Sequence, residues 1–237
     1  MFNILIPGLA GKLEVKYVRN NDDRCALILP PHPNQPQQYP KMNFDIRIVE
    51  CMENAFHKSG FSTLRVIYRG TGKSEGNITD APEEILRDTN KAINWLENNI
   101  PLVQELWISG YSYGAWLSLN MLMRRPEITG FVIVGLPTTN NYDYSFVSPY
   151  HDGGLIIQST QDPLSPNISE VQNIVQNLSA SSISQRDLID YTQIESNYYD
   201  FTHPDEFLKI ENRIFQHLND KLNSTKTTEH HSYQETT

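Results

Sequence analysis

Short apolar runs alternate with helical patterns along most of the chain. The runs are bounded by turn-forming residues and are rich in residues that favour strands. They cover residues 13–18, 25–30, 62–68, 105–110, 129–136, 154–160 and 188–194. Helical patterns cover residues 41–58, 82–98, 113–125, 166–180 and 204–219. Strands that alternate with helices predict an α/β fold with a mostly parallel central sheet and helices on both faces.

The alternation continues to about residue 220 without an internal repeat or a linker. We therefore expect residues 1–219 to form a single domain. Residues 220–237 are polar and rich in Thr, Glu and His. Such a composition is typical of a disordered tail.

The charge balance and the cysteines exclude several classes of protein. The 237 residues include 19 Lys and Arg against 28 Asp and Glu, and no basic cluster occurs, which argues against nucleic-acid binding. Pro7 and Gly8 interrupt the N-terminal apolar run, and no run approaches the roughly 20 residues of a membrane helix. We therefore expect a cytoplasmic protein without a membrane partner.

Cys25 and Cys51 match no zinc or CxxC spacing and are expected to be reduced thiols in or near the core.

Residues 69–76, RGTGKSEG, look like the end of a nucleotide-binding P-loop. That motif needs a glycine five positions before the Gly-Lys pair, where this chain has Ile67. The preceding residues are also strand-like and leave no space for the loop. We favour a simple turn in which Gly70 and Gly72 adopt backbone angles that other residues avoid.

Ser112 lies at the centre of the motif Gly-Tyr-Ser-Tyr-Gly, between a predicted strand and a predicted helix. This pattern is typical of a nucleophile elbow, in which the serine occupies a strained turn. Gly110 and Gly114 would relieve crowding against the neighbouring backbone. The alternative is a glycine-rich turn that has no catalytic role.

Four segments together resemble the small lidless α/β-hydrolases. They are LPPHP, LRVIYRGTGKSEG, LWISGYSYGAWLSLNMLMRRPEI and GLIIQSTQDPLSP, and the resemblance covers roughly residues 24 to 219. It implies an α/β-hydrolase fold without a cap domain. The motifs are poor guides to substrate. The hypothesis we favour is a serine hydrolase that acts on a small-molecule acyl substrate (an ester, thioester or amide) and needs no metal or organic cofactor.

The resemblance implies a catalytic triad in the chain order Ser, Asp, His. Asp162 follows the strand at 154–160, where the acid is expected. The family's histidine position is occupied here by Tyr199, and a phenol with a pKa of about 10 is a poor general base. His203, four residues later, is therefore the predicted base. If His203 only flanks the last helix, the alternative is a hydrolase-fold protein that has lost turnover and binds a ligand or partner.

An oxyanion hole needs two main-chain N–H groups, one of which belongs to the residue after the nucleophile, Tyr113. The resemblance assigns the other to the loop that contains His32. The three prolines of that loop have no N–H, so Asn34 is the predicted second donor. Two glycines that the family usually carries there are missing.

Residues 137–152 stand where larger α/β-hydrolases insert a cap domain, but the segment is too short to form one. It contains Tyr142, Tyr144, Phe146 and Tyr150. These rings would either line one wall of a shallow site or pack the loop onto the core.

Overall fold

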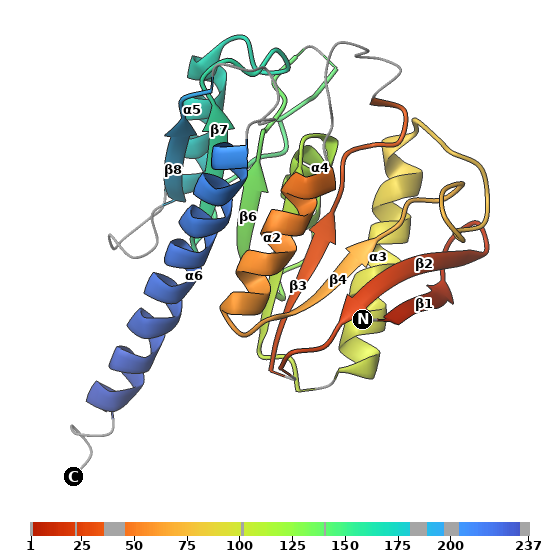
Figure 1. Cartoon of the computed structure of the whole chain (residues 1–237), viewed down its shortest axis with the longest axis horizontal. Helices are drawn as coiled ribbons and strands as arrows, with labels where there is room; N and C mark the ends of the chain where they lie inside the picture. The colour runs from red at the N-terminus through yellow and green to blue at the C-terminus, as the bar shows by residue number, and fades with distance from the viewer. Residues whose placement is uncertain are drawn as a thin grey trace.

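The computed structural model describes residues 2–21, 23–35, 46–100, 102–139, 141–180, 189–196 and 204–232, with side chains to residue 223. In this part of the chain the strands form one sheet in the order β1-β2-β4-β3-β5-β6-β7-β8 (Figure 1). The strands are β1 Phe2–Pro7, β2 Lys12–Val18, β3 Arg24–Leu29, β4 Ser62–Val66, β5 Glu105–Tyr111, β6 Ile128–Val134, β7 Gly154–Ser159 and β8 Ile189–Ile194. β1 and β2 pair antiparallel, and all pairs from β4 to β8 are parallel.

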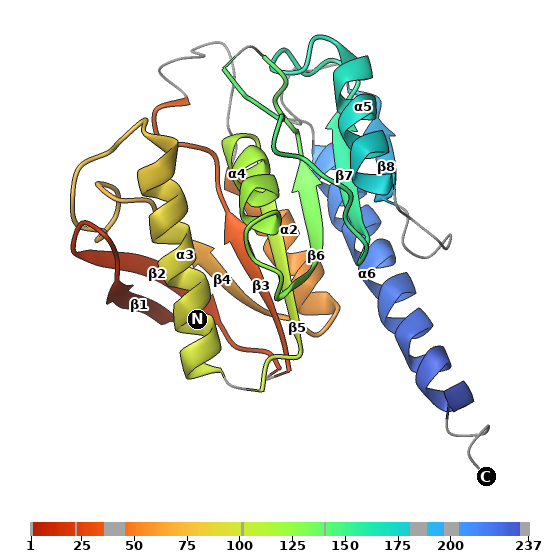
Figure 2. The same ribbon diagram turned by 180° about the vertical axis from the view of Figure 1, so that it is seen from behind.

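The helices cover both faces of this sheet (Figures 1 and 2). They are α2 Ile46–Lys58, α3 Pro82–Asn99, α4 Tyr113–Leu122, α5 Ile168–Ser179 and α6 Pro204–Ser232. α2 and α6 pack on one face, and α3, α4 and α5 pack on the other. Alternate residues of β5 serve the two cores: Leu106 and Ile108 join the α3/α4/α5 side, and Trp107 joins the α2/α6 side. Burial on both faces explains why the strands read as nearly continuous apolar runs.

Strand β1 is an element that the apolar pattern did not predict. It pairs antiparallel with β2 at the edge of the sheet. Ile4 and Ile6 face the core, but the apolar residues Phe2 and Leu5 are exposed, so apolar residues stand on both faces of the strand. An edge strand with one free side and partly exposed apolar residues does not show the period-two signature of a half-buried strand.

Helix α6 continues to Ser232, beyond the predicted end at residue 219 and into the segment whose composition suggested a disordered tail. Its buried apolar residues recur every four positions and pack on the α2 side of the sheet. They are Ile210, Ile214, Leu218 and Leu222. The last of these lies past the predicted end, so the apolar stripe carries the helix further than composition suggests.

The glycine-rich segment at 69–76 forms a turn, with positive φ at Gly70 (73°) and Gly72 (54°). Glu14 of β2 fills the inside of this turn, and its carboxylate accepts the Lys73 N–H at 2.7 Å. A Cβ on Gly72 would lie 2.5 Å from that carboxylate. A buried negative charge at this place is incompatible with a bound phosphate, so the favoured interpretation as a turn is confirmed.

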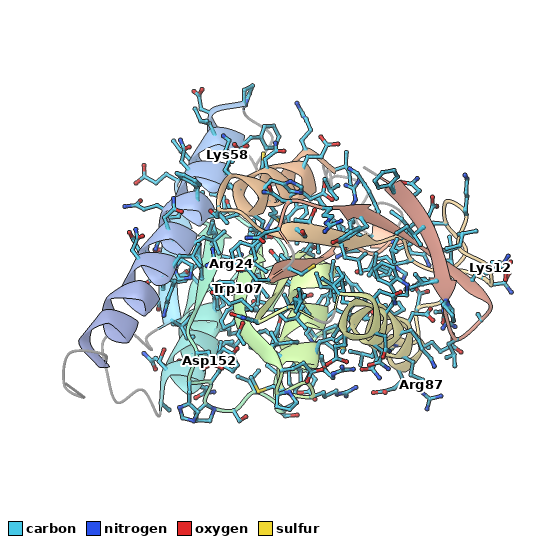
Figure 3. All side chains as sticks on the ribbon, turned by 90° about the horizontal axis from the view of Figure 1, so that it is seen from below. Lys12, Arg24, Lys58, Arg87, Trp107 and Asp152 are labelled. Atoms are coloured by element: carbon cyan, nitrogen blue, oxygen red, sulfur yellow. The ribbon has the colours of Figure 1, made fainter. Side chains whose placement is uncertain are left out.

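Side chains fill the space between helices and sheet, with Trp107 in the interior and Lys12 and Lys58 at the periphery (Figure 3). Cys25 and Cys51 are buried thiols, as predicted, and burial raises the pKa of the Cys25 thiol to about 12. Among the helices of the described segments, none combines the length and the apolar character that a membrane span requires.

His217 of α6 is a buried imidazole that faces Asp190 of β8. Its Nδ1 lies 2.6 Å from Asp190 Oδ2, and Arg213 contacts the same oxygen at 3.2 Å. His217 Nε2 is buried and has no hydrogen-bond partner among the described residues. Burial lowers the pKa of His217, while the hydrogen bond from His217 and the Arg213 charge lower the pKa of Asp190 to about 2. We infer that a neutral imidazole donates its Nδ1–H to an ionised carboxylate.

Acidification should therefore destabilise the fold through His217. In the unfolded chain His217 takes up a proton near pH 6.5, whereas its pKa in the folded state is lower. The contribution of His217 to the free energy of unfolding is therefore fully present above this pH and declines below it. Asp190 contributes nothing in this window, because its carboxyl stays ionised in both states above about pH 5. In His217→Gln, which retains a donor for Asp190, we expect a flatter stability profile than in the wild type between pH 7.5 and 5, measured by urea unfolding. Equal slopes for the two proteins would refute the assignment.

Candidate active site

Ser112 lies between β5 and α4 with φ 54° and ψ −116°. In the described segments, no other residue except glycine has a positive φ. Such a conformation costs about 1–3 kcal/mol and persists only where the surroundings enforce it. Two glycines allow it. A Cβ on Gly110 would lie 2.1 Å from the Gly114 carbonyl oxygen, and a Cβ on Gly114 would lie 2.0 Å from the Leu29 carbonyl oxygen. The serine turn therefore packs directly on its own helix and on the end of β3.

The N-terminus of α4 leaves a donor beside the serine. The N–H groups of Ala115 and Trp116 both reach the Ser112 carbonyl oxygen. No acceptor for the Tyr113 N–H is found within the described segments. The first N–H groups of a helix lack intrahelical partners and carry its partial positive charge. The Tyr113 N–H is therefore available beside the serine, and its role as an oxyanion donor stays a prediction.

The hydroxyl of Ser112 is covered by Gln35, a residue that the sequence did not single out. Gln35 Nε2 lies 3.0 Å from Ser112 Oγ and 3.2 Å from the Tyr142 hydroxyl. Ser112 is 3% exposed and Gln35 is 1% exposed. Nothing local in the sequence signals this contact, because 77 positions separate the two residues.

Asn34, the predicted second oxyanion donor, directs its main-chain N–H elsewhere in this structure. The Asn34 N–H donates to His32 Nδ1 at 3.2 Å, and the Asn34 side-chain amide donates to Asp80 at 2.9 Å. Its role in an oxyanion hole stays a prediction, and it would require the N–H to leave His32.

His32 is held as a neutral imidazole. Its Nε2 lies 2.8 Å from the Thr79 carbonyl oxygen and must donate to it, whereas Nδ1 accepts from Asn34. Burial lowers the pKa of His32. With both ring nitrogens committed to main-chain groups, His32 is not placed to act as a base on Ser112.

Asp162 follows β7, at the same end of the sheet as the serine turn. Its Oδ1 accepts the Leu164 N–H at 2.9 Å, and its Oδ2 accepts from the Gln158 amide at 2.8 Å. The residue is 8% exposed. An ionised carboxylate can accept about four hydrogen bonds, and these two fix the orientation of the Asp162 carboxylate.

The end of β6 connects the serine turn with the acid. The Val134 carbonyl oxygen accepts the Ser112 N–H at 3.1 Å. The next residue is Gly135, with φ 61°. A Cβ there would lie 3.2 Å from the Tyr111 ring and 3.6 Å from Asp162 Oδ2. The structure therefore brings Ser112 and Asp162 to either side of the same strand end.

The predicted base, His203, lies outside the described residues, as does Tyr199 in the family's histidine position. The histidines whose side chains are described are His32, His57, His151 and His217. None of them is a hydrogen-bond partner of Ser112 Oγ, and His57 and His217 are bonded to Thr63 and Asp190 instead.

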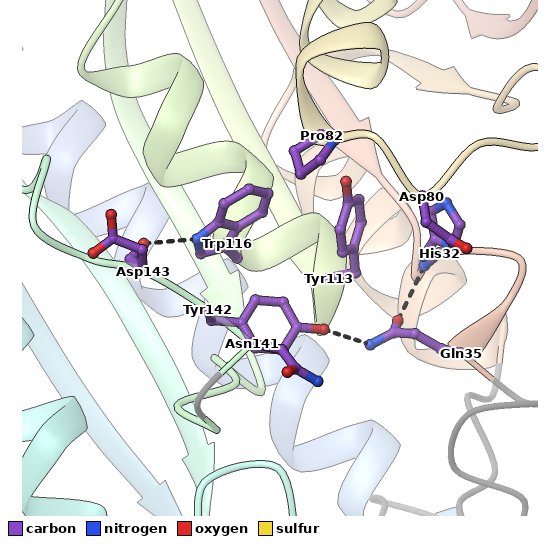
Figure 4. Close-up of a pocket in the computed structure, with 9 residues that line it drawn as sticks. All are labelled: His32, Gln35, Asp80, Pro82, Tyr113, Trp116, Asn141, Tyr142 and Asp143. Atoms are coloured by element: carbon purple, nitrogen blue, oxygen red, sulfur yellow. Dashed lines mark hydrogen bonds and ion pairs between the residues drawn. The ribbon is translucent and has the colours of Figure 1, made fainter.

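A cavity of about 400 Å³ adjoins the serine turn (Figure 4). It is lined by His32, Gln35, Asp80, Pro82, Tyr113, Trp116, Asn141, Tyr142 and Asp143. The Trp116 ring lies 5.6 Å from the Tyr113 ring and 5.9 Å from the Tyr142 ring. Among the described residues, the lining has two carboxylates and no Lys or Arg, and hydrogen bonds from Ser145 lower the pKa of Asp143. The cavity therefore offers aromatic surface and negative charge.

Both interpretations of residues 137–152 hold, each for different residues. Tyr142 lines the cavity. Tyr144, Phe146 and Tyr150 pack against the core on the α3/α4/α5 side. The Tyr150 hydroxyl also donates to the Ile128 carbonyl oxygen at 2.7 Å, which holds the loop down.

Known proteins share this fold over nearly their whole length. The model of the X-Pro dipeptidyl-peptidase (S15) family matches residues 16–233. A candidate α/β hydrolase of unknown function from Agrobacterium tumefaciens is 30% identical with a TM-score of 0.79, over 94% of this chain and 97% of that one. An uncharacterized protein of Rickettsia prowazekii is 29% identical over 236 residues, 98% of this chain and 92% of the other. A lidless α/β serine hydrolase of Xanthomonas campestris is 18% identical with a TM-score of 0.69, over 94% of each chain. The chain therefore has the α/β-hydrolase fold without a cap domain.

The crowding around Gly114 gives a direct test of the serine turn. In Gly114→Ala the new Cβ would meet the main chain of β3, which cannot move aside, and we expect a loss of about 3 kcal/mol or more in the free energy of unfolding. Gly60→Ala is the matched control, because it also removes a glycine but has no atom within 4 Å of the added Cβ. Its positive φ should cost only about 1 kcal/mol. Equal losses in urea unfolding would mean that the close approach to β3 is not the constraint.

Proposed function

This chain belongs to the X-Pro dipeptidyl-peptidase (S15) family, and from that premise we propose that it is a serine hydrolase acting on an ester, thioester or amide. The observation that carries the proposal is the strained turn at Ser112, directly before a helix whose first N–H, that of Tyr113, has no acceptor among the described residues. A nucleophile and an electrostatic site for a developing oxyanion are thereby adjacent.

In the proposed reaction, Ser112 Oγ attacks the carbonyl carbon while His203 takes the hydroxyl proton. The Tyr113 N–H stabilises the oxyanion of the tetrahedral intermediate. Collapse of the intermediate breaks the bond to the leaving group, which receives the proton from His203. Water, activated by the same imidazole, then hydrolyses the acyl-serine, and Asp162 orients the imidazole throughout.

The end of β8 supports His203 as the base. The Thr160 N–H, two residues before Asp162, donates to the Ile194 carbonyl oxygen at 3.1 Å. The Ser196 N–H approaches the Thr160 hydroxyl at 3.4 Å. Ser196, the last described residue before the segment with His203, therefore lies beside the turn that carries the acid, and α6 begins at Pro204, directly after His203 in the sequence.

The second candidate is a hydrolase-fold protein that binds a ligand or partner without turnover. Tyr199 in the family's histidine position and the covered hydroxyl of Ser112 favour it. The two functions differ by a large factor, because loss of the base from a triad lowers kcat by about 10⁶.

Labelling with a fluorophosphonate probe separates the two. We expect wild-type protein to react and Ser112→Ala to give no adduct. Labelling of His203→Ala should be slower by at least about 10³-fold, because the serine is no longer deprotonated. His151→Ala is the matched control, since this histidine precedes β7 at the opposite end of the strand from Asp162. Full labelling of His203→Ala would refute His203 as the base, and an unreactive wild type would favour the binding protein.

The cavity charge predicts a preference among substrates. Asp80 and Asp143 should attract a cationic aryl ester and repel an anionic one, so 4-(trimethylammonio)phenyl acetate should have a several-fold higher kcat/KM than 4-acetoxybenzoate. The ratio should fall at high salt and in Asp143→Asn, which removes the charge of a carboxylate that accepts hydrogen bonds from Ser145. If neither high salt nor Asp143→Asn changes the ratio, the charge of the cavity has no role in substrate binding. An X-Pro dipeptide amide belongs in the same panel because of the family's name.

A further inference from the structure

The loop after β3 presents a side-chain amide to the nucleophile. Gln35 Nε2 contacts the Tyr142 hydroxyl at 3.2 Å (Figure 4). It also contacts Ser112 Oγ at 3.0 Å, so each hydroxyl has one amide N–H available to it. The Gln35 side chain is enclosed between the loop and the wall of the cavity and is almost fully buried.

The orientation of the Gln35 amide follows from its other end. Gln35 Oε1 accepts the main-chain N–H of His32 at 3.0 Å. Because a main-chain N–H can only donate, the atom facing His32 must be the oxygen. The NH₂ group therefore faces Ser112. Since this group cannot accept a hydrogen bond, the Ser112 hydroxyl proton is left for a base.

The main-chain N–H groups of the same loop, residues 31–35, donate to acceptors within the loop. The Asn34 N–H donates to His32 Nδ1, and the Gln35 N–H donates to the His32 carbonyl oxygen at 3.0 Å. The His32 N–H is taken by Gln35 Oε1. Pro31 and Pro33 have no N–H. From residue 31 to residue 35, no main-chain donor is directed at Ser112, and the Gln35 amide takes that place.

The geometry points to Gln35 as a catalytic residue whose side-chain amide donates the second hydrogen bond to the oxyanion, beside the Tyr113 N–H. This inference rests on the proposed hydrolase function. In the tetrahedral intermediate, the oxyanion and Ser112 Oγ are bonded to the same carbon. A donor in contact with Oγ is therefore adjacent to the position that the oxyanion takes, and a small rotation of the amide is enough to reach it.

The surroundings of Gln35 suit this role because they hold the donor in place before the reaction. Oε1 is fixed by His32, and Nε2 is fixed by Tyr142. His32 is itself held by the Thr79 carbonyl oxygen, and its ring packs 4.9 Å from the Tyr113 ring. A buried donor that is already held next to the oxyanion position stabilises developing charge more strongly than one exposed to water.

Two substitutions at Gln35 test the inference. Gln35→Glu keeps an oxygen for the His32 N–H but replaces the donor with a carboxylate oxygen, and Gln35→Met removes both polar atoms at similar size. For hydrolysis of p-nitrophenyl acetate, we expect each to lower kcat by about 10²–10³ with little change in KM. The affinity for an aryl trifluoromethyl ketone, which forms a tetrahedral adduct with the serine, should fall by a similar factor. Tyr142→Phe, which retains the amide donor, should lose less than about tenfold.

The outcomes separate this inference from the function on which it rests. Wild-type turnover with undiminished kcat in both Gln35 variants overturns the inference and leaves the hydrolase function standing. A fall in kcat without weaker binding of the trifluoromethyl ketone also overturns it, because Gln35 would then act only through the shape of the loop. A wild type that neither hydrolyses the ester nor binds the ketone, with Ser112→Ala as the blank, overturns both.

Discussion

The site depends on the close main-chain contact between the serine turn and the end of β3. Gly114 sits so near the Leu29 carbonyl oxygen that no side chain fits between them. This contact fixes where α4 begins relative to the sheet, and Ser112 adopts its strained φ as a consequence. The strain is tolerated because two parallel neighbours, β3 and β6, hold the turn from either side.

The same contact determines what reaches the nucleophile. The chain that leaves Leu29 turns directly into the loop of residues 31–35, so any change in the approach of α4 to β3 would also move Gln35 relative to Ser112. The main-chain N–H groups of this loop donate to acceptors within the loop itself, and these hydrogen bonds all involve His32. Nucleophile and proposed oxyanion donor are thus positioned by one packing arrangement, although 77 positions separate them in the chain.

On the other side of the site, the acid is organised by polar contacts within β6, β7 and the turn that follows. Gln158 of β7 links the segments that follow the two strands, because its amide oxygen accepts the Leu136 N–H after β6 and its NH₂ group donates to Asp162 after β7. The carboxylate is thereby oriented independently of the serine turn. Further along, α6 is attached to β8 through Asp190 and His217, which fixes the helix that directly follows the segment with His203.

Much of this architecture is determined by the sequence alone, because it follows from local patterns. Apolar runs buried on two faces identified the parallel strands, and the spacing of Gly110, Ser112 and Gly114 identified the turn. Strand β1 and the C-terminal turns of α6 escaped prediction, since edge exposure and an extended apolar stripe outweigh composition there. The contact of Gln35 with Ser112 was decided by tertiary structure only. The reach of a side-chain amide depends on how its loop folds back over a distant strand end, and no local periodicity encodes that.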